Sequence, residues 1–577
     1  MLRDRIDAAA GRRPFDVLIQ NVRVVNCFDR SAREGCIGIA DGVIAYAGPG
    51  GDFPALRTVD GDGCWALPGF VDAHMHLESS MVTPSRFARA ALACGTTTVA
   101  ADPHEIVNVL GPEGARFLLD DAEGVPLRIV MAAPSTVPSK PGLEGSGCDV
   151  RGEDMRRMLE SGLFSGMGEM MDFLGASRAD PRTVGILEEA QRAGCLMDGH
   201  ASILTGRDLM AFRAAGIDSD HTARTGDKVR EELSLGFWVQ LQEATLSEDT
   251  VRAAAQAPVK DRICLVTDDV PLPRLMRKGH LNRVYALAVE MGLDPMDAVR
   301  FTTINPATRL RLYGVGGIAP GMAADLQLVR DIRRPAPERV FFAGREVFAG
   351  GNCLFDPRPR GKAAPAPLNV DVRMEDFRIP APEGASSVRV NTVCQDGRTS
   401  RTVRGSAVLP AKGGAADAKG FVKMAVFNRY GARRHGLGLV TGMPRMDGAV
   451  ALTYGHDCHN LSVYGTRDGD MLLAAETVKA AGGGLCAVSK GSVLSLVPLP
   501  IAGLMSPKEC GELCGEIESF LLCCRKIGME HSDILTFLTL MPLAASPEIK
   551  ITDKGIIDVT RGCLIPLTDE AERSERS

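Results

Sequence analysis

Two histidines spaced two residues apart are the first sign of chemistry in this chain. His74 and His76 follow a short apolar run in the stretch Pro-Gly-Phe-Val-Asp-Ala-His-Met-His. Because alternate residues of a strand point the same way, both imidazoles can face one metal ion. Taken alone the pair has an ordinary explanation, since polar residues commonly mark the point where a strand gives way to a loop.

Four further residues that can bind a metal also follow short apolar runs. They are Glu169, His200, His221 and Asp268, each after a separate run. In a barrel of parallel strands, the carboxyl ends converge on the face that carries the active site. Nitrogen and oxygen ligands without cysteine suit Zn, Mn or Fe. Six ligands are too many for one tetrahedral catalytic ion with an open position. The set therefore predicts two ions bridged by a carboxylate.

Eight apolar runs could supply the strands that position these residues. They cover residues 71–73, 97–101, 128–132, 166–170, 196–199, 217–219, 237–241 and 263–267. Helix-type segments separate several of them, and eight βα units in about 250 residues are typical of a TIM-type (β/α)8 barrel. The pattern predicts an α/β protein built around such a barrel.

The sequence on either side of the barrel predicts two more units. Residues 16–25, 36–48 and 317–329 alternate in the manner of strands, whereas residues 356–367 are rich in Pro and Ala, as linkers are. The predicted organisation is a small flanking β domain of residues 1–64 and 310–355, a barrel of 65–309, a linker of 356–367, and an additional C-terminal α+β domain of 368–577.

Composition and charge exclude several classes of protein. A net charge of −6 and a pI near 6.0 argue against a nucleic-acid partner, which calls for a basic surplus. The longest apolar stretch, residues 493–505, is too short for a membrane span, and the N-terminus lacks the apolar region of a signal peptide. Sixteen cysteines without a CxxC motif are typical of buried thiols in a reducing cytosol. P-loop and Gly-x-Ser-x-Gly motifs are absent. We expect a cytoplasmic protein with no membrane partner.

Twelve groups of motifs extend over nearly the whole chain and carry a family resemblance. They are 74–81 (His-Met-His-Leu-Glu-Ser-Ser-Met), 95–99, 102–106 (Asp-Pro-His-Glu-Ile), 168–171, 219–221, 267–269, 303–307, 317–325, 455–460 (Gly-His-Asp-Cys-His-Asn), 482–484, 499–505 and 549–553. Together they resemble the amidohydrolase superfamily and, within it, the bacterial adenine deaminases.

The resemblance implies a binuclear metal centre, with Mn²⁺ as the expected ion and Fe²⁺ or Zn²⁺ as alternatives. One ion would be held by His74, His76, Glu169 and Asp268, and the other by Glu169, His200 and His221. Glu169 would be the bridge, since no lysine occupies that position. The resemblance also places His104 near the substrate, as a catalytic residue beside Glu169 and Asp268.

The implied reaction is hydrolysis of adenine to hypoxanthine and ammonia, in purine salvage. A metal pair lowers the pKa of a bridging water toward about 7, which gives hydroxide to attack C6. Asp268 would accept the proton and pass it to the departing ammonia, a step worth on the order of 10²–10⁴-fold. Glu78 or Glu105 could bind the substrate by donating a proton to its ring nitrogen.

Three places depart from the family's usual pattern. Thr222 follows His221 where an acidic residue is usual, residues 240–245 carry glutamines and an alanine where an Arg-Glu-Gly-Ser pattern is usual, and Asn282 replaces an aspartate. None of these is a proposed ligand, so they bear on the substrate. The alternatives are another aminopurine, a cyclic amide, or a binding protein without catalysis.

A polar cluster in the C-terminal unit has two interpretations. His456, Cys458 and His459 could lie in a loop that braces this unit, or they could form a third metal site or a substrate contact. We favour the bracing loop, because two histidines and one cysteine lack the remaining ligands of a structural zinc site. The expected partners are the small-molecule substrate adenine and a second copy of the chain in a homodimer.

Overall fold

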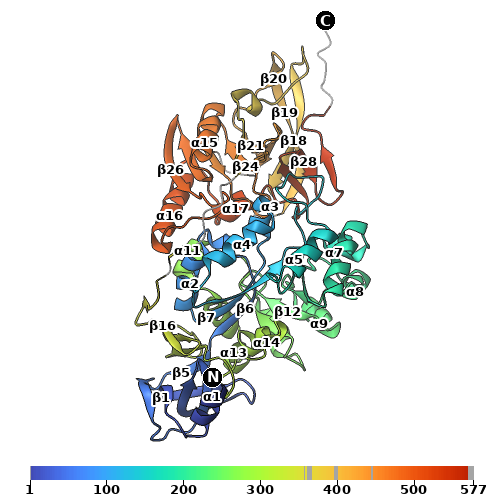
Figure 1. Ribbon diagram of the computed structural model, residues 1–577. Helices are drawn as coiled ribbons and strands as arrows, with labels where there is room; N and C mark the ends of the chain where they lie inside the picture. Colours follow the sequence, from blue (N-terminus) through green and yellow to red (C-terminus); the bar gives the residue numbers. More distant parts are fainter. Residues whose placement is uncertain (1, 357, 360–366, 396–400, 443–445, 570–577) are drawn as a thin grey trace. The chain divides into compact units, whose positions relative to one another are not determined.

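The computed structural model describes residues 2–356, 358–359, 367–395, 401–442 and 446–569, which form two compact units (Figure 1). Unit 1 comprises Met1–Pro103, Leu118–Ser135 and Arg151–Gly361, and unit 2 comprises His104–Phe117, Thr136–Val150 and Lys362–Ser577. Most of the predicted linker, 356–367, lies outside the described residues.

Eight parallel strands form the barrel of unit 1. They are β6 (Phe70–Met75), β7 (Thr96–Ala101), β8 (Arg128–Ala133), β9 (Gly166–Met170), β10 (Leu196–Gly199), β11 (Ser219–Asp220), β12 (Trp238–Leu241) and β13 (Ile263–Leu265). Strands β6 to β10 pair in sequence order, as do β11 to β13, and a parallel bridge from Met75 to Asp268 joins the two ends. Each strand overlaps one of the eight predicted runs, so the predicted fold class is confirmed.

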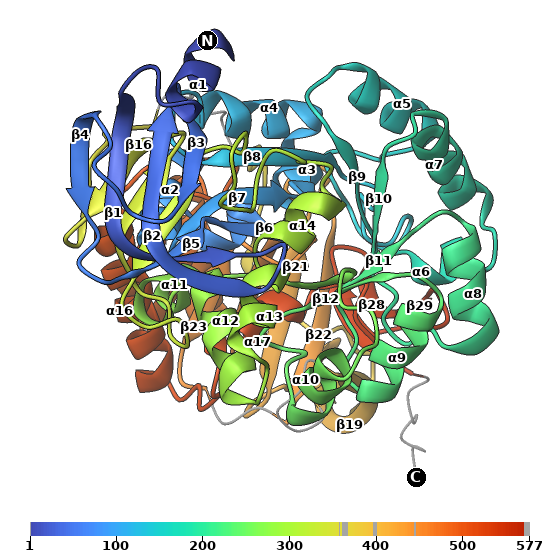
Figure 2. The same ribbon diagram turned by 90° about the horizontal axis from the view of Figure 1, so that it is seen from below.

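Helices follow the strands and cover the outside of the barrel, as α7 to α9 do beside β9 to β11 in Figure 2. They are α2 (Pro84–Ala93), α5 (Gly152–Glu160), α6 (Phe173–Ser177), α7 (Pro181–Arg192), α8 (Gly206–Ala214), α9 (Gly226–Ser234), α10 (Glu248–Ala255), α11 (Leu272–Lys278), α12 (Leu281–Glu290), α13 (Pro295–Phe301) and α14 (Ile304–Arg309), with the 3-10 turn η1 (Leu77–Ser80) after β6. Asp180 caps α7 by accepting the amide hydrogens of residues 182 and 183, and Pro181 has the backbone angle of a first helical residue. Asp294 and Pro295 start α13 in the same way.

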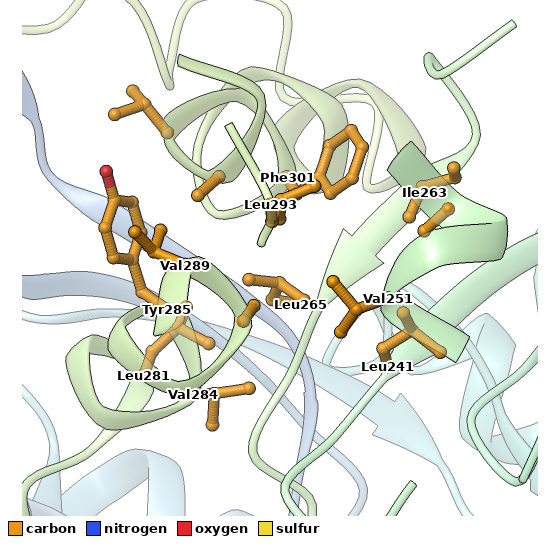
Figure 3. Packing of buried hydrophobic residues seen from close by; sticks show 14 of the residues in the cluster. Leu241, Val251, Ile263, Leu265, Leu281, Val284, Tyr285, Val289, Leu293 and Phe301 are labelled. Atoms are coloured by element: carbon orange, nitrogen blue, oxygen red, sulfur yellow. The ribbon is translucent and has the colours of Figure 1, made fainter. Parts of the chain in front are cut away.

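A hydrophobic cluster fixes strands β12 and β13 to the surrounding helices (Figure 3). Leu241 and Leu265 point from the strands toward Val251 of α10 and Phe301 of α13, and all four side chains are buried. The hydroxyl of Tyr285 donates to the backbone oxygens of residues 295 and 332, which satisfies its one polar atom. Each such side chain stabilises the fold by about 1.5–3 kcal/mol, so the strand ends that follow are held rigidly.

A nine-stranded sheet flanks the barrel in unit 1, with helix α1 (Leu2–Ala9) beside it. Its strands are β1 (Phe15–Asn26), β2 (Ser31–Ala40), β3 (Val43–Gly48), β4 (Ala55–Asp60), β5 (Trp65–Pro68), β14 (Leu326–Val329), β15 (Pro337–Phe342), β16 (Arg345–Ala349) and β17 (Asn352–Cys353). Because β14 pairs antiparallel with β5, the chain that leaves the barrel completes the sheet that the N-terminal strands begin.

Unit 2 has mixed α and β structure. Its nine-stranded sheet contains β18 (Ser387–Gln395), β19 (Thr402–Lys412), β20 (Ala415–Ala416), β21 (Val422–Phe427), β22 (His435–Thr441), β23 (Ala449–Leu452), β24 (Leu461–Gly465), β25 (Gly484–Ser489) and β26 (Ser492–Pro498). A smaller sheet contains β27 (Ile549–Thr552), β28 (Gly555–Asp558) and β29 (Cys563–Ile565), and the helical elements are η2 (Met374–Phe377), α15 (Asp468–Ala480), α16 (Cys510–Lys526) and α17 (Ile534–Leu540). Helices α15 and α16 pack beside β25 and β26 (Figure 1).

Two segments of the predicted barrel range group with unit 2 instead. The chain enters this unit after β7 at helix α3 (His104–Leu110), continues into α4 (Pro112–Asp121), and enters it again after β8 in residues 136–150. Within unit 2, Gly145 donates its amide hydrogen to Asp553 at 2.7 Å and accepts from the Asn460 side chain at 2.8 Å. These long-range hydrogen bonds explain why the unit is not a contiguous piece of sequence.

No described helix is long and apolar enough to cross a membrane.

Candidate metal centre

The six predicted metal ligands lie together at the carboxyl ends of five barrel strands. His76 Nε2 is 3.3 Å from Glu169 Oε1 and 3.2 Å from Asp268 Oδ1. His74 Nε2 is 3.8 Å from the same two oxygens. The strands deliver these side chains because His74 and His76 alternate on β6, Glu169 lies in β9, and Asp268 follows β13.

The two oxygens of the Glu169 carboxylate face different pairs of histidines. Oε1 faces His74 and His76, whereas Oε2 lies 2.8 Å from His200 Nδ1 and 3.4 Å from His221 Nε2. This division is the arrangement that a carboxylate needs in order to bridge two cations. Burial alone would raise the pKa of Glu169, but the surrounding histidines outweigh it and hold that pKa well below its usual range.

The donor atoms fit divalent cations. His74 Nε2 is buried and makes no hydrogen bond with any described residue, while its Nδ1 lies 2.8 Å from Asp198. His76 Nδ1 lies 3.0 Å from the backbone oxygen of Asp102. In each ring the hydrogen on Nδ1 is thereby committed, which leaves Nε2 as the nitrogen that faces the carboxylates and could bind a cation.

Asp198 is a member of the site that the sequence did not single out. Besides His74, its carboxylate accepts hydrogen bonds from Gln240 at 3.0 Å, Arg309 at 2.8 Å and the Ser219 hydroxyl. Burial opposes protonation of His74, but Asp198 outweighs it and raises the pKa of His74 to about 9, so binding of a cation at Nε2 would release a proton. A signal was available in the sequence, because Asp198 lies two residues before His200, and side chains two apart on an extended chain point the same way.

Close backbone packing fixes the bridge position. The amide hydrogen of Glu169 is donated to Asp102 Oδ2 at 2.8 Å, and the Ser135 hydroxyl donates to the backbone oxygen of Glu169 at 2.6 Å. Gly168 permits this approach, since a Cβ there would lie 2.2 Å from Asp102 Oδ2. The close approach of Asp102 to β9 therefore requires glycine at position 168.

Asp268 has an unusual backbone and an unexpected neighbour. Its φ of 59° is in the left-handed region, which non-glycine residues seldom adopt outside special sites. Its amide hydrogen is donated to the backbone oxygen of His74 at 3.1 Å, and its Oδ2 accepts from the side-chain amide of Gln242. Gln242 belongs to the stretch that departs from the family pattern, so this departure lies directly beside a predicted ligand.

The predicted substrate residues lie in two different places. Glu78 is buried in η1, two residues after His76. His104 and Glu105 begin α3 in unit 2, where His104 Nε2 is 2.9 Å from Asp457 and Glu105 contacts His456 and His459. The substrate-contact and catalytic roles of these three residues stay predictions.

Comparison with known proteins defines first the class and then the family. The family model "Amidohydrolase family" matches residues 65–347, which span the barrel and part of the flanking sheet. The model "Adenine deaminase C-terminal domain" matches residues 400–563. This is a metal-dependent hydrolase of the amidohydrolase class, and its metal-type clusters of histidine and carboxylate accord with divalent metal binding.

Relatives match over nearly the full chain. The adenine deaminase of Desulfatibacillum aliphaticivorans is 36% identical over 97% of this chain and 98% of its own length. Adenine deaminase 2 of Carboxydothermus hydrogenoformans is 34% identical over 98% and 99%, and the adenine deaminase of Nitratidesulfovibrio vulgaris strain Hildenborough is 36% identical over 97% of each. The chain therefore belongs to the adenine deaminase family. Among solved structures, the L-hydantoinase of Arthrobacter aurescens is 18% identical over 59% of this chain and 98% of that one, with a TM-score of 0.43.

Proposed function

We propose that this chain is an adenine deaminase, which hydrolyses adenine to hypoxanthine and ammonia for purine salvage. The observation that carries the proposal is the division of the Glu169 carboxylate between two histidine pairs. It occurs in a chain that matches adenine deaminases from end to end, including the C-terminal domain. Full-length similarity favours adenine over the other aminopurines and cyclic amides that the barrel alone would allow.

The proposed cofactors are two divalent cations, with Mn²⁺ as the ion in the cell. One would be held by His74, His76, Glu169 and Asp268, and the other by Glu169, His200 and His221. When bound, such a pair supplies a water whose pKa is lowered toward about 7, and hence a nucleophile at neutral pH. Mixed nitrogen and oxygen ligands suit Mn²⁺ as well as Fe²⁺ or Zn²⁺.

Asp268 is the proposed proton carrier. Burial would raise its pKa, but His76 and the neighbouring histidines hold that pKa below its usual range, so Asp268 is ionised at neutral pH. The hydrogen bond from Gln242 leaves Oδ1 directed toward His76 at 3.2 Å. Asp268 would take the proton of the attacking water and return it to the amino group as ammonia departs, a contribution on the order of 10²–10⁴-fold.

The test is a substrate panel on protein stripped by chelation and reloaded with Mn²⁺. Ammonia release is measured with adenine and 2,6-diaminopurine, and ring opening is measured with a cyclic amide such as dihydroorotate, whose hydrolysis releases no ammonia. The stripped protein is the control for all three substrates. We expect adenine to have the highest kcat/KM and the stripped protein to be inactive. A preference for the cyclic amide would contradict the assignment.

Two further parts of the proposal concern the cell and the assembly. None of the described cysteines takes part in a disulfide bond, which supports a reducing cytoplasmic location. We also propose a homodimer, and light scattering coupled to size-exclusion chromatography measures its mass directly.

A further inference from the structure

A second group of metal-type side chains lies in unit 2. It joins the start of α3 to the loop before β24, across about 350 residues of sequence, through His104, Glu105, His456 and Asp457. His104, Glu105 and Asp457 are buried, and only His456 is partly exposed. Buried carboxylates and imidazoles of this kind must be paired with one another or bind a cation.

Four ligand atoms of this group form a closed ring. His104 Nε2 is 2.9 Å from Asp457 Oδ1, which is 3.2 Å from His456 Nδ1. His456 Nδ1 is 2.9 Å from Glu105 Oε1, which is 3.9 Å from His104 Nε2. A tetrahedral ion with bonds of about 2.0–2.1 Å separates its ligands by roughly 3.3–3.4 Å. The four distances around the ring, from 2.9 to 3.9 Å, lie on both sides of this ligand separation. The ligand atoms of the group all lie within 4.8 Å of one another.

Neighbouring donors orient the ligand atoms. Glu105 Oε2 accepts the amide hydrogen of Asp457 at 2.9 Å and lies against His459 Nε2, so Oε1 is the oxygen left to face the ring. The Asn108 side chain donates to the backbone oxygen of Asp457 at 2.8 Å, which ties that loop to α3. Metal ligands in proteins are commonly held by outer partners of this kind.

The charge of the group suits a divalent cation. Two carboxylates with two neutral imidazoles carry a charge that one divalent ion neutralises. Cys458 does not belong to the group, since its sulfur accepts a hydrogen bond from Asn460.

We propose that unit 2 binds a divalent cation, of which Zn²⁺ fits the spacing, through His104 Nε2, Glu105 Oε1, His456 Nδ1 and Asp457 Oδ1. Four protein ligands leave no open position, so the site is structural and joins α3 to the loop before β24. The proposal gives His104 and Glu105 this structural role in place of the catalytic and substrate-contact roles expected from the sequence. The sequence favoured a bracing loop because the remaining zinc ligands were missing, and the structure supplies them from α3 and Asp457.

The experiment measures zinc content in the full-length protein after dialysis against Zn²⁺ and removal of free metal. A barrel-deficient variant, His74→Ala with His76→Ala and Glu169→Ala, isolates the unit 2 site and should retain one zinc per chain. Adding His456→Ala should abolish that zinc, whereas His435→Ala, a control histidine in the same unit, should leave it in place. A barrel-deficient variant without zinc, or zinc unchanged by His456→Ala, would overturn the proposal.

A second measurement does not depend on the barrel-deficient variant. In the otherwise natural chain, His456→Ala and the near-isosteric Glu105→Gln should each lose one zinc relative to wild type, with circular dichroism confirming that both are folded. If these variants keep every zinc and instead raise KM for adenine, the group contacts substrate and the site is refuted. Zinc content is read independently of deaminase activity, so failure of the proposed function would not affect this result.

Discussion

Replacing Asp198 with asparagine tests how the site prepares its histidines for metal. Three side-chain donors, from Gln240, Arg309 and Ser219, converge on Asp198 Oδ1, while Oδ2 faces His74 Nδ1 at 2.8 Å. In Asp198→Asn the carbonyl oxygen must take the Oδ1 position to satisfy those donors, so the NH₂ group faces His74. His74 then has to accept a hydrogen bond at Nδ1 and carry its hydrogen on Nε2.

That change removes the lone pair with which His74 would bind metal. Substitution of an outer partner of a metal ligand typically costs 10- to 100-fold in metal affinity, which is about 1.4–2.7 kcal/mol. We expect a loss in this range, measured by competition of the protein with a chromophoric chelator for Mn²⁺. Unfolding by heat is followed in parallel, so that a loss of fold is recognised separately.

Asp218→Asn is the matched control for this experiment. Asp218 Oδ1 lies 3.0 Å from Nη1 of the same Arg309. Within the described residues, Asp218 makes no contact with His74. Its variant should keep wild-type metal affinity. If Asp198→Asn binds both ions normally, or if Asp218→Asn is equally impaired, the argument from the His74 tautomer is refuted.

Three further predictions concern the bridge, the substrate and unit 2. Glu169→Gln should lose metal and activity together, because a neutral amide can hardly bind two cations. Asp268→Asn should retain more metal than Glu169→Gln yet lose about 10²-fold or more in kcat. Metal content and turnover are measured for both variants, and near-normal turnover of Asp268→Asn would exclude Asp268 as the proton carrier. Adenosine should be a far poorer substrate than adenine, as ammonia release will show, and comparable kcat/KM values would overturn the assignment to a free base. Ending the chain after residue 356 should give insoluble or inactive protein, because the segments His104–Phe117 and Thr136–Val150 would remain without the rest of unit 2, against which they pack. A soluble truncated protein with normal turnover would show that the rest of unit 2 is dispensable.

The sequence determined the barrel and which residues end its strands. Apolar runs of three to five residues recur between helical segments, and parallel strands must bring their carboxyl ends to one face. This local periodicity was enough to select His74, His76, Glu169, His200, His221 and Asp268, and the structure brings all six together.

Only the tertiary structure decided which distant residues complete these groups. Arg309 reaches Asp198 across 111 positions, and Glu105 reaches His456 across 351, through side chains whose partners no local pattern specifies. The same holds for the chain segments after β7 and β8, which have helix and loop patterns of their own but group with unit 2. The physical reason is that periodicity records which face of an element is buried, whereas a polar contact depends on which other element packs there.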